Sequence, residues 1–198
     1  MRTKTYLLTS IIFTGIIAMS SCSSGKKVSR IDAAEQIDLS GRWNETDSRQ
    51  VAEAMVKDLV SRPWAMEFQA NNDRKPTILV GLIRNKSHEH ISSETFTKDI
   101  ERELTNSGRA KLVAGGDARN ELREERADQQ NFASKSTAKE WGKELGADFI
   151  MQGTINSIVD SDGKSKVIFY QIDLELTSVE TNEKVWIGDK KIKKFIKK

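Results

Sequence analysis

A continuous apolar run, TILVGLI at residues 77–83, is the feature that most restricts how this chain can fold. A strand with no polar alternation is typical of the centre of a sheet, where side chains are buried on both faces. The run therefore predicts a central strand with helices packed on both faces of its sheet.

A helix and a second strand are expected to follow this run. Phe96, Ile100 and Leu104 recur every fourth residue within residues 92–108, a segment that starts with a serine suited to an N-cap and ends with a glycine. Residues 111–114 then predict a short strand. The three segments together predict a strand-helix-strand unit.

Three further helices are expected. Residues 48–61 carry an apolar stripe at helical spacing, with a capping box predicted at Asp47 and Gln50 and an end before Pro63. Residues 118–130 are rich in charge and predict a mostly solvated helix. A second capping box predicts a helix at residues 137–145.

The last third of the chain changes to the period of strands. Residues 149–159 predict a long strand, residues 166–177 alternate apolar and polar side chains, and residues 184–191 predict a final strand. Three antiparallel strands after a strand-helix-strand unit predict an α/β fold: a single domain with a mixed sheet of about five strands and helices on both faces.

The first residues have the pattern of an export signal. Arg2 and Lys4 precede an apolar segment of 13 residues, and the small residues before Cys22 resemble a bacterial lipobox. The segment is shorter than the roughly 20 residues that a stable transmembrane helix needs. We therefore expect Cys22 to be acylated and to become the first residue of the mature chain. Bacterial lipoproteins that stay in the inner membrane commonly carry an Asp directly after the cysteine. Because Ser23 stands at that position, the same resemblance implies an anchor in the outer membrane, and we expect the domain to face the periplasm.

Composition limits the classes of function. Without residues 1–21, the chain has 30 Lys and Arg against 29 Asp and Glu, because the removed segment holds two of the 32 basic residues and no acid. A nearly neutral domain offers no general support for nucleic-acid binding. Residues 184–198 are the exception, with seven lysines and one acid. These lysines either protect an edge strand from pairing or form a patch for anionic partners.

No constellation of residues predicts catalysis. Cys22 is the only cysteine and belongs to the lipobox, and no G-x-S-x-G motif is present. His88, Glu89 and His90 could contact a metal, but no further His or Cys completes a zinc site, so a solvated loop is favoured. We expect no enzyme activity, no metal, no cofactor and no small-molecule substrate.

Several blocks resemble the penicillin-binding protein activator family, LpoB type. They are the lipobox, DLSGRWNETDSRQVAEAMVKDLVSRPW, TILVGLIRNKSHEHI, RADQQNFAS, ELGADFIMQGTINSIVD and VWIGDKKIKKFIKK, in the order of the family. The resemblance implies a domain similar to the amino-terminal domain of TolB. It also implies an outer-membrane lipoprotein that binds a bifunctional penicillin-binding protein and stimulates peptidoglycan synthesis. The expected organisation is a signal peptide at 1–21, a linker at 22–37 and an LpoB-like domain at 38–198, as a monomer.

Exposure and residue type suggest where such a partner could bind. Aromatic residues beside arginines at the ends of the first helix either pack onto the sheet or contact a partner, and the C-terminal lysines are further candidates. The residues are Arg42, Trp43, Arg62, Trp64, Lys190 and Lys191.

A different function class stays open as an alternative. An assembly or secretion lipoprotein of the curli-channel type uses a related α/β domain, but it needs alternating strands of about ten residues. Only residues 166–177 meet that requirement.

Overall fold

The computed structural model describes residues 28–32, 35–132 and 146–197. Residues 36–198 form one compact unit, and residues 1–35 form a separate unit. All buried hydrophobic side chains of the described residues lie between Val51 and Trp186, so the compact unit contains the core. The single domain expected from the sequence is confirmed. Cys22, the signal segment and the expected helix at 137–145 lie outside the described residues.

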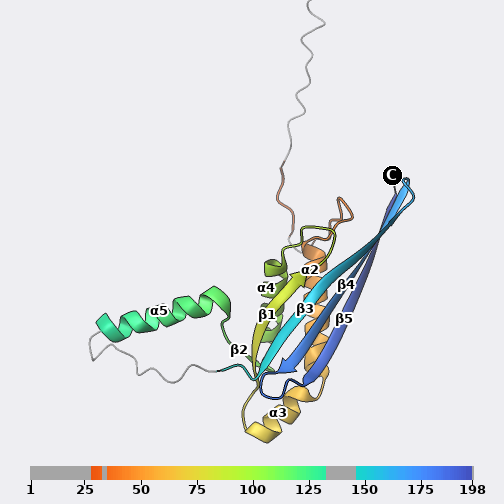
Figure 1. Ribbon diagram of the computed structural model, residues 1–198. Coiled ribbons are helices and arrows are strands. Elements are labelled where there is room, and N and C mark those ends of the chain that lie inside the picture. Colours follow the sequence, from red (N-terminus) through yellow and green to blue (C-terminus); the bar gives the residue numbers. More distant parts are fainter. Residues whose placement is uncertain (1–27, 33–34, 133–145, 198) are drawn as a thin grey trace, which may run out of the picture. The chain divides into compact units, whose positions relative to one another are not determined.

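Five strands form one mixed sheet in the order β2-β1-β3-β4-β5 (Figure 1). β1 pairs in parallel with β2 and β3, whereas β3, β4 and β5 are antiparallel to one another. The strands are β1 (Thr77–Asn85), β2 (Lys111–Leu112), β3 (Phe149–Ser161), β4 (Ser165–Ser178) and β5 (Lys184–Lys197). The predicted mixed sheet is therefore confirmed, with a final strand six residues longer than expected.

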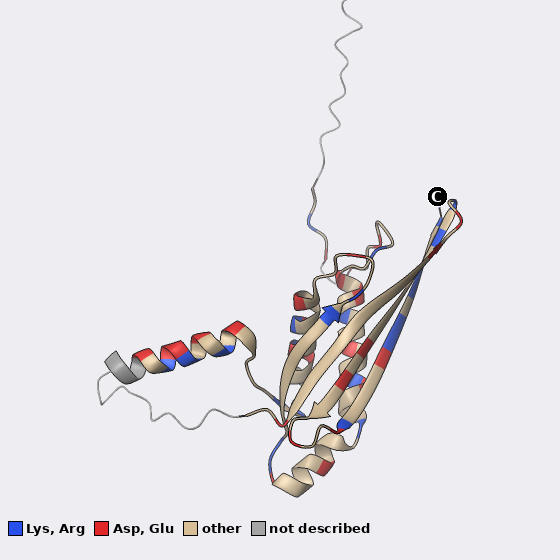
Figure 2. Ribbon diagram, in the orientation of Figure 1, with Lys and Arg blue, Asp and Glu red and all other residues tan. Residues whose placement is uncertain are grey.

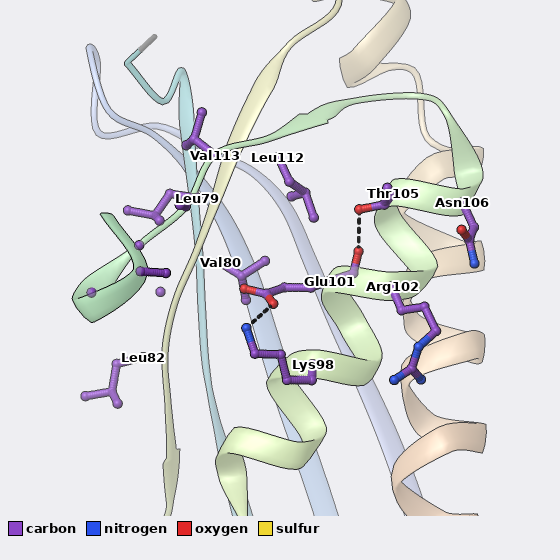
Figure 3. Close-up of a pocket in the computed structure, with 15 residues that line it drawn as sticks. Leu79, Val80, Leu82, Lys98, Glu101, Arg102, Thr105, Asn106, Leu112 and Val113 are labelled. Atoms are coloured by element: carbon purple, nitrogen blue, oxygen red, sulfur yellow. Dashed lines mark hydrogen bonds and ion pairs between the residues drawn. The ribbon is translucent and has the colours of Figure 1, made fainter. Parts of the chain in front are cut away.

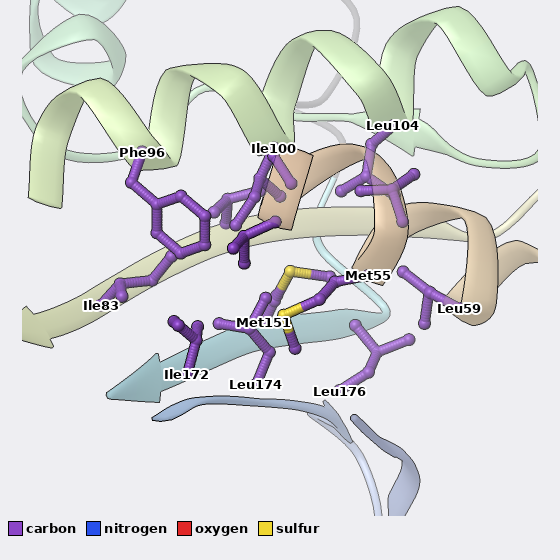
Figure 4. Close-up of a cluster of buried hydrophobic side chains, with 14 of the residues drawn as sticks. Met55, Leu59, Ile83, Phe96, Ile100, Leu104, Met151, Ile172, Leu174 and Leu176 are labelled. Carbon is purple, nitrogen blue, oxygen red and sulfur yellow. The ribbon is translucent and has the colours of Figure 1, made fainter. Parts of the chain in front are cut away.

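Four helices are described: α2 (Glu45–Ser61), α3 (Trp64–Asn72), α4 (Ser93–Ser107) and α5 (Gly116–Phe132). α2 packs against α4 and contacts β5, while α4 contacts β1 and β2. The two helices cover the same face of the sheet (Figure 4). We call this the helix face and the opposite one the open face.

From the sequence we expected helices on both faces of the sheet. Among the described residues this is wrong, because α2 and α4 cover the same face. In β1, Ile78, Val80 and Ile83 are buried on the helix face, but Leu82 is 56% exposed on the open face. An apolar run reads the same whether a helix or only neighbouring side chains cover its second face. The sequence pattern therefore could not distinguish the two arrangements.

The core lies between α2, α4 and the helix face. The α4 residues Phe96, Ile100 and Leu104 are at most 1% exposed, as their spacing predicts. Burying each such side chain contributes about 1.5–3 kcal/mol. α4 is fixed at both ends, because Ser92 Oγ accepts the Thr95 N–H and Gly108 adopts a left-handed φ of 63°. Figure 4 shows their partners in the core, Met55, Leu59, Ile83, Met151, Ile172, Leu174 and Leu176.

The start of α2 differs from the prediction by one turn. Asn44, not Asp47, is the N-cap: its side chain accepts the Asp47 N–H, and the Asp47 carboxylate accepts the Asn44 N–H in return. Asp47 was expected to be the first member of a capping box and is instead the second. Pro63 ends α2 as predicted, but it then opens α3, a helix that the sequence analysis missed.

Candidate partner-binding surfaces

The segment before α2 is attached to the far end of β5 through Lys194. The Lys194 ammonium contacts Asp38 at 2.7 Å and Asp47 at 2.6 Å, and it donates to the Arg42 carbonyl at 3.0 Å. The Lys194 and Asp47 side chains are only 11% and 10% exposed. Burial lowers the pKa of Lys194, but the hydrogen bonds to Asp38 and Asp47 outweigh it and raise the pKa above its usual value. The ion pairs thus hold this lysine charged.

A second polar cluster joins the same segment to the loop after β1. The Tyr170 hydroxyl donates to the Glu89 carboxylate at 2.8 Å, and the Trp43 N–H donates to both groups at 3.1 Å. Burial, followed by the hydrogen bond to Glu89, raises the pKa of Tyr170. Sequence reasoning missed this cluster because its members come from three distant segments.

The loop that contains the two histidines also contributes contacts to this cluster. His88 Nδ1 lies 2.7 Å from Ser157 Oγ, and His88 Nε2 lies 3.3 Å from the Glu89 carboxylate. Glu89 is thus bonded to protein groups. Within the part of the chain that the structure describes, no group of three or more His, Cys, Asp or Glu is placed to hold a metal ion.

The two tryptophans proposed for partner binding are mainly packed. Trp64 is 5% exposed, and its indole N–H donates to the Leu59 carbonyl at 2.8 Å. Trp43 is half-buried, with its ring edge-on to Phe96 and Tyr170. Trp64 therefore offers no side-chain surface to a partner, and Trp43 offers part of one.

The proposed basic residues are exposed but do not form one site. Arg42 and Arg62 flank the two ends of α2, which spans about 25 Å for 17 residues. Lys190 and Lys191 pair with Ile172 and Gln171 of β4 and so project from opposite faces of β5. The structure brings none of these four side chains together.

An open groove of about 830 Å³ runs beside β1 (Figure 3). β2 pairs with only two residues of β1, Thr77 and Ile78, so the rest of that edge of β1 has no strand beside it among the described residues. Lys98 and Glu101 of α4 form an ion pair of 2.8 Å at its side. The groove is also lined by Leu79, Val80, Leu82, Arg102, Thr105 and Leu112.

The open face carries exposed apolar side chains at two separate places on β5. Ile187 is 67% exposed near the start of the strand, and Phe195 is 66% exposed near its end. Ile158 of β3 is 66% exposed as well. In Figure 2 several stretches of the β5 ribbon have the blue colour of Lys and Arg. Contiguous exposed apolar side chains with charged neighbours are typical of surfaces that bind other macromolecules.

These features define a class: a single-domain α/β protein in which the described helices that pack on the sheet leave one of its faces open, with a groove at the edge of the sheet. None of the described helices is long and apolar enough to cross a bilayer.

Comparison with known proteins places this class more narrowly. A model of the family described as peptidoglycan-synthase activator LpoB matches residues 47–192, which is more than half of the chain. The chain therefore belongs to the LpoB family. A comparison with curated protein sequences gave no significant match.

Solved structures give matches of low identity. The LpoB C-terminal domain from Salmonella enterica is 15% identical, with 74% of this chain and 98% of that chain covered and a TM-score of 0.44. The domain from Escherichia coli is 16% identical, with 77% and 99% covered and a TM-score of 0.43. Lipoprotein GNA1162 from Neisseria meningitidis is 14% identical, with 61% and 83% covered and a TM-score of 0.40.

Proposed function

We propose that this chain is a lipid-anchored activator of a bifunctional peptidoglycan synthase, and that it acts by binding rather than by catalysing a reaction. The observation that carries the proposal is the match of residues 47–192 to the family of peptidoglycan-synthase activators. The domain faces the periplasm from the outer membrane, as a monomer that needs no cofactor.

The anchor is proposed to be Cys22. An apolar segment, two small residues and a cysteine followed by a serine-rich stretch support this assignment. Several acyl chains hold a protein at a membrane essentially permanently, since each buried methylene contributes about 0.8 kcal/mol. Mass spectrometry of the chain purified from membranes should give a mature protein that begins with acylated Cys22. An unmodified thiol would contradict the anchor.

The proposed mechanism is a shift in the conformations of the synthase. An activator raises a rate without chemistry of its own if it binds the active conformation more tightly than the inactive one. A rigid docking surface suits this role, because little conformational entropy is lost on binding. The packed core and the two polar clusters that fix the segment before α2 give the domain such rigidity.

The proposed docking residues are the candidates whose side chains are exposed, most of which are basic. Arg42, Arg62, Lys190 and Lys191 keep exposed side chains, and Trp43 adds a partly exposed ring. Trp64 is not among these residues, because its side chain is 5% exposed.

Crosslinking in intact cells, followed by isolation of the anchored chain, tests both the partner and this surface. We expect a bifunctional synthase to be recovered, and Arg62→Glu to reduce its recovery. Arg49→Glu is the matched control, because both arginines pair with an acidic residue of α2 four positions earlier. Recovery of no such synthase contradicts the proposed partner, and equal recovery with both variants contradicts the role of Arg62.

A further inference from the structure

The outer ends of β3, β4 and β5 form an arm that extends beyond the rest of the sheet (Figure 1). β1 ends at Asn85, opposite Ile155, whereas β3 continues to Ser161. Six further residues add about 20 Å of strand. We define the arm as residues 156–161, 165–171 and 191–197.

The open face of the arm carries a compact apolar cluster. Strand pairing sets Ile158 opposite Phe169 and Val167 opposite Phe195, and all four side chains alternate away from the buried positions of their strands. Ile158 and Phe195 are each 66% exposed. Such exposure of two large apolar side chains beside a third and a fourth is unfavourable unless another surface covers them.

Two exposed lysines lie beside this cluster. Lys193 pairs across the strands with Phe169 and projects from the same face, and Lys197 projects from it two residues after Phe195. Both are exposed, and neither has an ion pair in the described structure. On the same face Asp160 is the acid within the arm. Asp173 and Asp189 lie opposite each other just before the arm, where Asp189 pairs with Lys191 at 3.1 Å, and Glu175 pairs with Lys184 farther along. The face therefore combines apolar side chains with two available positive charges.

The chain enters the folded unit at this same end. Asp38 is fixed to Lys194 of β5, and residues 38–41 line a shallow pocket of about 420 Å³ together with residues 194–197. Leu39 in this segment is 94% exposed and adds to the apolar surface. An anchor upstream of Gln36 would therefore attach beside the arm.

We propose that the open face of the arm binds a bilayer surface containing anionic phospholipid, with Ile158 and Phe195 at the level of the acyl boundary and Lys193 and Lys197 at the headgroups. Apolar and aromatic side chains flanked by lysines have this affinity, because burial and attraction to anionic lipid act together. The position of the anchor, which belongs to the proposed function, favours a membrane over a soluble acidic partner.

Sedimentation with lipid vesicles tests this arm without the anchor. Residues 36–198, which hold the whole core, are mixed with vesicles of phosphatidylglycerol and phosphatidylcholine, or of phosphatidylcholine alone. We expect binding only to the anionic vesicles, weakened by salt. The double variant Lys193→Gln and Lys197→Gln should bind about 25-fold more weakly, at about fivefold for each lysine. Lys57→Gln with Lys111→Gln, the same charge change elsewhere, should bind as the unaltered domain does.

The apolar part of the arm has its own matched pair of variants. Phe195→Ser should weaken vesicle binding by roughly tenfold, because it removes apolar surface that the bilayer would bury. Ile187→Ser removes a side chain of equal exposure from the same face of the same strand, about 26 Å away, and should have no effect. Circular dichroism should show that all variants keep the fold. Equal binding by both serine variants, or by both double lysine variants, overturns the proposal.

A synthase assay in detergent separates this inference from the proposed function. There the arm variants should stimulate the synthase as the unaltered domain does, since no bilayer is present. Loss of stimulation by Phe195→Ser together with normal vesicle binding would make the arm a protein interface and overturn the proposal. Failure of the unaltered domain to stimulate any synthase would contradict the proposed function and leave the vesicle result standing.

Discussion

Replacement of Lys194 by methionine should destabilise the domain more than any other single lysine change on β5. Methionine keeps most of the apolar stem and removes the ammonium that contacts Asp38 and Asp47. Asp47 is 10% exposed, so its carboxylate would stay largely buried without a cation. Breaking one side of a buried ion pair costs about 3–5 kcal/mol.

For Lys194→Met we expect a loss at the lower end of this range of about 3–5 kcal/mol. Asp38 is 40% exposed and can turn to water, and the Asp47 carboxylate keeps the N–H of Asn44. We therefore expect Lys194→Met to lower the free energy of unfolding by about 3 kcal/mol. For a domain of this size the melting temperature should fall by about 6–12 °C.

Urea unfolding followed by circular dichroism measures this loss. Lys193→Met is the control, because that neighbouring lysine is exposed and forms no ion pair with a described residue, so its change should stay within about 0.5 kcal/mol. Adding Asp47→Asn to Lys194→Met should recover part of the loss, since the unpaired charge disappears. A Lys194→Met variant as stable as the control would refute the reasoning.

The charge state of this cluster also sets a pH dependence. Hydrogen bonding from Lys194 is the main cause that lowers the pKa of Asp38. The ionised Asp38 carboxylate therefore contributes to the stability of the domain above the ordinary aspartate pKa, and this contribution is lost as the pH falls through the lowered pKa. The raised pKa of Lys194 acts in the opposite direction. The charged Lys194 ammonium contributes fully to stability below the ordinary lysine pKa, and this contribution is lost as the pH rises through the raised pKa.

Three further changes test other parts of the structure. Gly153→Ala should cost about 2–3 kcal/mol in urea unfolding, because an added Cβ would overlap the backbone of β4; a neutral effect would contradict the close approach. Asp148→Asn should cost about 1.5–3 kcal/mol at neutral pH, since Arg74 donates to both carboxylate oxygens at 2.7 Å. Because the hydrogen bond from Arg74 lowers the pKa of Asp148, this difference should shrink as the pH falls below about 4, and a constant difference would exclude the ionised group as its source. Tyr170→Phe should cost about 1–3 kcal/mol by removing a donor from Glu89, and a change within error would show that water replaces the hydroxyl.

Local signals in the sequence were sufficient for most secondary structure. The spacing of Phe96, Ile100 and Leu104 predicted α4 and its buried side, and Pro63 predicted the end of α2. These signals act within one or two turns of chain, so they need no knowledge of the tertiary structure. α3 carried no such signal, because its apolar and polar residues form no single stripe.

The length of β5 was underestimated for a physical reason. Its last residues, KIKKFIK, are dominated by lysine, and the predicted strand ends at residue 191, the first of them. In the structure Ile192 and Ile196 pack against the core, and Lys194 is neutralised between two carboxylates. A lysine can be buried at this position of the strand because Asp38 and Asp47, about 150 positions earlier in the chain, balance its charge.

The candidate surfaces depend on the same long-range contacts. The cluster of Trp43, Glu89 and Tyr170 joins residues up to 127 positions apart. Sequence reasoning selected Trp64 for its type and position, yet its side chain packs into the core. Residue type predicts what a side chain can bind, whereas its exposure is decided by the fold.

The rate of glycan polymerisation by a bifunctional synthase tests the central claim most directly. The rate is measured with a fixed amount of synthase and increasing amounts of residues 36–198, with the domain alone as the control. The account predicts that the rate rises and saturates as the domain fills its site, and that the domain alone forms no product. An unchanged rate at every concentration, or product formed by the domain without synthase, would contradict it.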